Sequence, residues 1–116
     1  MFYQSNTAII AGYQWVQSVE ITAGNNIPFP ANCTIIGHVR ETEGSNTVLT
    51  TVSTANSSII RVSNTEIQIV ISGDASVNWK AGDIVMDLVR TDTSPYQHTG
   101  LRFDIPVVLP ITRNLT

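Results

Sequence analysis

The sequence has little of what secreted, nucleic-acid-binding or membrane proteins need. Among 116 residues Cys33 is the only cysteine, so no internal disulfide can form and folding in a reducing compartment is expected. Lys and Arg number six against nine Asp and Glu, which predicts no cationic patch and no binding to nucleic acid. Apolar runs are only a few residues long, which predicts no membrane span. No basic region followed by a long apolar one opens the chain, which predicts no signal peptide.

β-Branched residues dominate what is present. Ile, Val and Thr together number 40, whereas Ala, Leu, Lys and Met together number 15. The first group suits a pleated sheet and the second favours helices, so the composition predicts an all-β protein. It argues against a helical bundle, a coiled coil and a βαβ nucleotide fold. With 42% hydrophobic residues and a net charge of only −3, the chain should bury a core within one domain.

Alternation of apolar and polar residues with a period of two predicts about seven strands. They are expected over residues 13–22, 33–41, 47–53, 58–62, 66–72, 83–91 and about 99–109. Residues 73–82 lack the alternation, which predicts one short helical corner with Trp79 pointing into the core. The regular spacing of the strands is typical of an antiparallel β-sandwich. Because proline cannot donate a backbone hydrogen bond, Pro106 should lie at a sheet edge or a bulge.

No constellation in the sequence predicts catalysis. Cys33 and His38 could form a nucleophile and base, but a five-residue separation on one strand points their side chains to opposite faces. Two histidines and one cysteine lack the paired spacing of a zinc site. Asp83 and Asp87 share a strand face, which suits a solvated surface better than paired carboxylates. We therefore expect no catalytic residue, no cofactor, no metal and no enzyme activity.

Apolar residues gather at both ends of the chain. Extended apolar ends suit strand addition to a neighbouring subunit, and they equally suit completion of the domain's own sheets. Both alternatives remain open from the sequence. The candidate interface residues are Phe2, Tyr3, Ile9, Ile10, Val107, Val108, Leu109 and Ile111.

Aromatic residues offer one candidate for recognition of a ligand. Tyr13, Trp15 and Trp79 fall in patterns that predict a place in the core. Tyr96 follows Pro95 in a predicted loop, where its ring should be exposed. Exposed aromatic rings bind sugars, so Tyr96, Gln97 and His98 form a candidate recognition loop.

Several segments, taken in order, resemble a known group of proteins. They are Ile10-Ala11-Gly12-Tyr13-Gln14-Trp15, Ile27-Pro28-Phe29, Gly37-His38-Val39-Arg40, Ile67-Gln68-Ile69-Val70-Ile71-Ser72, the helical corner at Trp79, the stretch from Ala81-Gly82-Asp83 to Arg90-Thr91-Asp92, the stretch from Leu101 to Val108, and Ile111-Thr112-Arg113. This order resembles small immunoglobulin-like proteins and domains of tailed bacteriophages, among them the N-terminal domains of baseplate upper proteins. The resemblance spans residues 9–113.

The resemblance implies a structural role without catalysis. It implies an N-terminal arm over 1–8, an immunoglobulin-like β-sandwich over 9–113 and a tail over 114–116. The chain would be an adaptor, connector or decoration subunit of the tail, baseplate or head–tail region, made in the bacterial cytoplasm and present in the virion. Its partners would be other virion proteins and copies of itself. The alternative function is a recognition module that binds a host-surface glycan.

Overall fold

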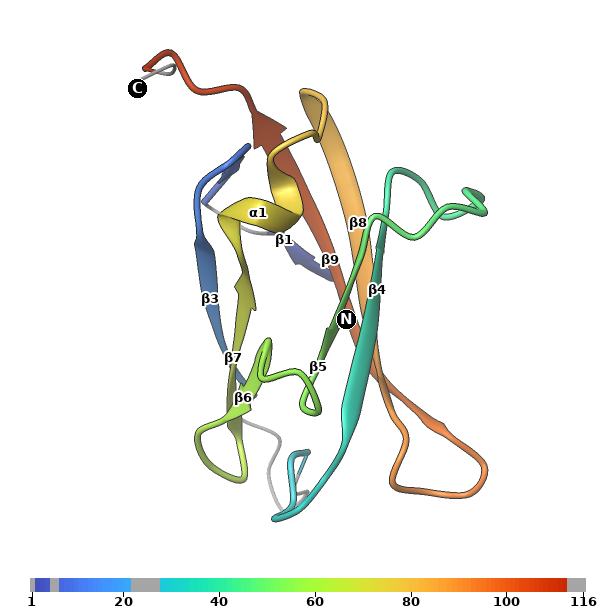
Figure 1. Ribbon diagram of the computed structural model, residues 1–116. Helices are drawn as coiled ribbons and strands as arrows, with labels where there is room; N and C mark the ends of the chain where they lie inside the picture. The colour runs from blue at the N-terminus through green and yellow to red at the C-terminus, as the bar shows by residue number, and fades with distance from the viewer. Residues whose placement is uncertain (1, 5–6, 22–27, 113–116) are drawn as a thin grey trace.

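The computed structural model describes residues 2–4, 7–21 and 28–112 (Figure 1). The chain is all-β, as its composition predicts. Its elements are β1 (Phe2–Gln4), β2 (Ile9–Ile10), β3 (Trp15–Glu20), β4 (Ile35–Arg40), β5 (Thr50–Ser53), β6 (Ile59–Arg61), β7 (Glu66–Ile71), α1 (Gly73–Ser76), β8 (Gly82–Arg90) and β9 (Gln97–Val108). Each of the seven predicted strands corresponds to one of these, with ends that differ by a few residues.

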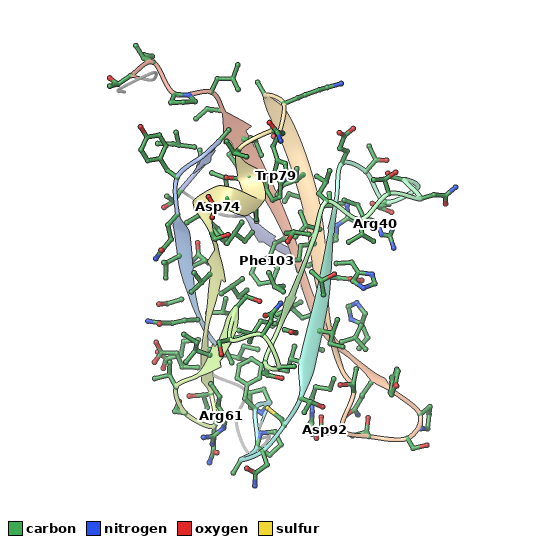
Figure 2. All side chains as sticks on the ribbon, in the orientation of Figure 1. Arg40, Arg61, Asp74, Trp79, Asp92 and Phe103 are labelled. Carbon is green, nitrogen blue, oxygen red and sulfur yellow. The ribbon has the colours of Figure 1, made fainter. Side chains whose placement is uncertain are left out.

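The strands form two sheets on either side of one core (Figure 1). The large sheet has the order β1-β9-β8-β4-β5, with β2 also paired to β9, and the small sheet has the order β3-β7-β6. Inward positions alternate as predicted: Ile84, Met86 and Leu88 on β8 are all buried. Phe103 on β9 and Trp79, which follows α1, lie between the sheets in Figure 2. The two sheets therefore bury their apolar faces against each other.

The N-terminal residues add two short strands that the sequence pattern did not predict. β1 and β2 run parallel to β9, with Phe2 opposite Arg102 and Ile9 opposite Val107. The large sheet is therefore mixed, and the expectation of a purely antiparallel arrangement is wrong at this edge. The predicted arm over 1–8 contains β1, and the predicted tail over 114–116 lies outside the described residues.

Pro106 lies within β9, an interior strand of the large sheet. On one side it is opposite Asp83 of β8. On the other side β1 is in register with residues 102–104 and β2 with residues 107–108, so Pro106 falls between the two pairings. Contrary to expectation, Pro106 is thus not at an outer edge or a bulge. It lies at a break between two short strands, where its missing backbone N–H donor is tolerated.

The corner after β7 ties the two sheets together. Ser72 caps α1 by accepting a hydrogen bond from the Ala75 amide at 3.2 Å. The fully buried Ser76 hydroxyl accepts a hydrogen bond from the Gly12 amide at 3.0 Å, which joins α1 to the link between β2 and β3. Trp79 is buried as predicted. The predicted helical corner is therefore present, and it anchors the N-terminal crossing between the sheets.

Candidate functional site

On the outer face of the large sheet, charged and polar side chains of neighbouring strands lie opposite one another. Three rows cross β4, β8 and β9. The middle row places Asp87 between His38 and Arg102. The rows on either side are Arg40–Val85–Asp104 and Ile36–Val89–His98. Figure 2 shows Arg40 on the side of β4 that faces away from the small sheet. This face therefore brings together residues from three strands that are far apart in the sequence.

His98 is held by both of its ring nitrogens. Nε2 lies 2.9 Å from Oδ2 of Asp87, and Nδ1 accepts a hydrogen bond from the Gly100 amide at 2.8 Å. Because Nδ1 accepts, Nε2 carries the proton and donates it to Asp87. The imidazole therefore has a fixed orientation, and neither nitrogen is positioned to take a proton from a substrate.

Arg102 is the basic centre of the same face. It bonds to Glu43 from the β4–β5 connection, and its Nη2 lies 3.5 Å from Oδ1 of Asp104. The hydrogen bond with Glu43 is the main cause that raises the pKa of Arg102. Arg40 holds the same connection, since its Nη1 donates to the Ser45 carbonyl at 2.9 Å.

Two open depressions lie on this face. They adjoin each other, since His38 and Asp87 line both of them. The first, of about 220 Å³, is also lined by Arg40, Glu43 and Arg102. The second, of about 260 Å³, is lined by Tyr96 together with Ile36, Val89 and Thr91. One side of the shared wall is thus charged, and the other is largely apolar and aromatic.

The predicted recognition loop is only partly a loop. Tyr96 is 70% exposed, as expected, and precedes β9. Gln97 and His98 belong to β9, where they are opposite Arg90 and Val89. His98 is therefore displayed on the sheet face by the strand register, which the sequence analysis did not foresee. The Asp87–His98 and Glu43–Arg102 pairs were also missed, because they depend on long-range register and not on spacing along the chain.

The predicted interface residues divide into two groups. Ile9 and Val107 are buried in the chain's own core. Ile10 and Val108 are paired with each other and remain 44% and 43% exposed, while Leu109 and Ile111 are 53% and 98% exposed. The backbones of Phe2 and Tyr3 are paired with β9, and their side chains lie outside the described part of the structure.

Two further apolar side chains join this exposed group. Tyr13, which was predicted in the core, is 46% exposed, and its hydroxyl donates to the Thr112 carbonyl at 3.4 Å. Val77 is 59% exposed and adjoins Gly12 at the start of the crossing. The prediction for Tyr13 fails because Gly12, with φ of +89°, turns the chain before β3 begins. We call Ile10, Tyr13, Val77, Val108, Leu109 and Ile111 the apolar end; it lies where the C-terminal segment leaves the fold (Figure 1).

The remaining candidates for chemistry lie apart. Cys33 is buried whereas His38 is exposed, so the two point to opposite faces as predicted. Within residues 2–4, 7–21 and 28–112, no group of three or more His, Cys, Asp or Glu side chains is placed to hold a metal ion. No helix in the same ranges is long and apolar enough to cross a membrane.

Comparisons with protein-family models, with curated proteins and with solved structures found no match to this chain.

Proposed function

We propose that this chain is a structural subunit of a bacteriophage virion and acts through protein–protein assembly. It would serve as an adaptor, connector or decoration subunit of the tail, baseplate or head–tail region, made in the bacterial cytoplasm. The observation that carries the assembly role is the apolar end, where three segments that meet in the fold each leave apolar side chains exposed. The resemblance of residues 9–113 to immunoglobulin-like phage proteins supports the proposal that the chain is part of a virion.

We further propose that the two sheets form an immunoglobulin-like sandwich. The small sheet β3-β7-β6 has the strand order B-E-D of such domains, and β9-β8-β4-β5 has the order G-F-C-C′. Trp15 lies buried on the strand equivalent to B, and no disulfide is needed because the core is filled by aliphatic side chains. This assignment makes the outer face of β4, β8 and β9 one broad surface and the apolar end a separate one.

The apolar end has the composition of an interface core. A stable contact buries about 800 Å² on each partner, with apolar and aromatic side chains at its centre. Apolar surface of this kind is uncommon on a free monomer unless it binds something. The partner would be another virion protein or a further copy of this chain.

Point substitutions test this interface better than a truncation. Removing residues 1–8 would take β1 out of the large sheet and so disturb the fold itself. Leu109→Ser and Ile111→Ser change only exposed side chains. Both variants should fold normally and fail to enter particles. Normal incorporation of both would overturn the assembly role of the apolar end.

A second candidate function is recognition of a host-surface glycan through the outer face. It is favoured by the 70% exposed ring of Tyr96, which lies beside His38 and Asp87 in one depression. Aromatic faces bind the apolar faces of sugars while polar neighbours bind the hydroxyls. Binding to a glycan array that is lost in Tyr96→Ala would support it, and silence on a broad array would oppose it. In either case the chain would act by binding, since both ring nitrogens of His98 are already engaged.

A further inference from the structure

Glu43 places a carboxylate in a depression that is also lined by His38, Arg40 and Arg102 and by a second carboxylate, that of Asp87. Glu43 follows β4 in the chain, yet it bonds to Arg102 on β9, two strands away across β8. Arg40 and His38 border the same depression, and Arg40 Nη2 donates to His38 Nδ1 at 3.4 Å. Because Nδ1 accepts, the neutral His38 ring carries its proton on Nε2. The carboxylate of Glu43, bound to Arg102, is therefore supplied to this depression by the protein itself.

We propose that this depression binds the carboxylate of an acidic sugar, and that Glu43 occupies the place of that carboxylate when the site is empty. The inference rests on the second candidate function, glycan recognition at the outer face, and it names the ligand class. It is independent of assembly through the apolar end.

The side chains around the two depressions match the groups of a uronic acid. The planar guanidinium of Arg102 fits a carboxylate with two parallel hydrogen bonds. Asp87 accepts and His38 donates, which suits neighbouring sugar hydroxyls. On the far side of these two residues, Tyr96 offers an exposed ring for the apolar face of the same or the next sugar unit. A volume of about 220 Å³ for the first depression is on the scale of a single sugar unit.

Glu43 can exchange for a ligand because its side chain is mostly exposed. Its side chain is 70% exposed, whereas that of Arg102 is 28% exposed. Ion pairs with one largely exposed partner contribute little to stability, so a second carboxylate can displace Glu43 at small cost. Arg102 keeps its contact with Asp104 during the exchange, and its position on β9 is fixed by the pairing with Asp87.

The surrounding charges favour carboxylates that are separated by hydroxyl groups over a densely charged acidic peptide. Asp87 and Asp104 flank Arg102, and the whole chain carries a net charge of −3. A densely charged acidic peptide would meet like charges on both sides of the one guanidinium. A uronic acid carries one carboxylate per sugar unit and presents hydroxyls to the flanking acids.

The test measures binding of tri-galacturonate to the full chain by calorimetry and by NMR titration, with neutral galactotriose and tri-glutamate as comparison probes. Arg102→Gln should abolish binding of tri-galacturonate. Glu43→Gln should tighten it by about two- to fivefold, since the competing charge is gone. Glu41→Gln is the matched control, because Glu41 lies two residues away and lines a different depression. Tyr96→Ala should weaken binding of the acidic trisaccharide at least fivefold.

Each outcome decides for or against the proposal. Saturable binding of tri-galacturonate that Glu43→Gln strengthens and Glu41→Gln leaves unchanged supports it. No saturable binding, equal binding of galactotriose, or equal binding of tri-glutamate overturns it. Binding of neutral glycans that depends on Tyr96 but not on Arg102 or Glu43 would overturn the carboxylate site while leaving glycan recognition standing. The Glu43 comparison remains decisive even if Arg102→Gln fails to fold, because Glu43 is on an exposed connection.

Discussion

Gly37 on β4 lies against Leu88 on β8 with no room for a methyl group between them. The two residues are directly opposite each other in the large sheet. A Cβ atom at Gly37 would lie 2.6 Å from Cδ2 of Leu88 and 2.9 Å from both the Asp87 carbonyl oxygen and Cγ2 of Val52. Such distances are well inside van der Waals contact, so the missing side chain is what lets these strands and the core come together.

Gly37→Ala is therefore expected to lower the free energy of unfolding by about 1–3 kcal/mol, the usual cost of overfilling a core. The measurement is urea denaturation followed by tryptophan fluorescence. Gly44→Ala is the control, since a Cβ at this exposed position meets nothing within 4 Å, and it should change stability by less than about 0.5 kcal/mol. Equal stability of the two variants would contradict the close contact between β4 and β8 at Gly37.

Ser76→Ala should destabilise the crossing between the sheets. The substitution removes the hydroxyl that accepts the Gly12 amide at 3.0 Å, in a residue with no exposed surface. Gly12 itself is exposed and the hydrogen bond is partly buried, so its loss should cost about 0.5–1.5 kcal/mol. Ser18→Ala, at an exposed position on β3, should be nearly neutral in the same denaturation measurement. A neutral Ser76→Ala would mean that the Gly12 amide does not depend on this bond.

The Arg90–Asp92 pair should make stability depend on pH in the acid range. Nε and Nη2 of Arg90 donate to the two carboxylate oxygens of Asp92 at 3.2 and 2.7 Å. The hydrogen bond from Arg90 is the main cause that lowers the pKa of Asp92. A lowered folded-state pKa stabilises the fold above the ordinary value of about 4, and this contribution is lost as the pH falls through the lowered value.

Asp92→Asn should thus reduce Tm at pH 7, and the difference from wild type should narrow as the pH drops below about 4. Asp83→Asn removes the same charge from an exposed position on β8 and controls for net charge. A difference between wild type and Asp92→Asn that stays constant from pH 7 to strong acid would contradict the ion pair.

The Cys33 thiol should be unreactive in the folded protein. It is buried, and burial is the main cause that raises its pKa, so little thiolate is present at pH 8. We expect its reaction with Ellman's reagent to be at least about tenfold slower in the native chain than in urea. Equal rates in the two conditions would show that Cys33 is accessible.

The strands of this fold were predictable where one face of the strand is buried and the other is exposed to solvent. On β8 and β9 the predicted inward residues are the buried ones, although Val85 and Val89 are apolar residues on the outward side of β8. Phe103 points in and Arg102 points out, as the period of two requires. The local corner was predictable for the opposite reason, because residues 73–82 break the alternation.

Pairing between distant strands was not predictable. β1 and β2 are too short to show a period, and their parallel register with β9 comes from contacts about 100 residues apart. For the same reason, the candidate site could not be predicted from the sequence. Tyr96 could be chosen because its place in a predicted loop with Pro95 indicates an exposed ring. The rows that join His38, Asp87 and Arg102 exist only once three strands are in register.

Assembly into a virion through the apolar end can be measured by counting this chain in purified phage particles. Quantitative mass spectrometry would compare wild type with Ile111→Ser and with Val62→Ser, a matched change at an exposed position between β6 and β7. We expect wild type and Val62→Ser at the same copy number, and we expect Ile111→Ser, with an unchanged Tm, to be missing. Absence of the wild-type chain from the particles, or Ile111→Ser at the wild-type copy number, would contradict assembly through the apolar end.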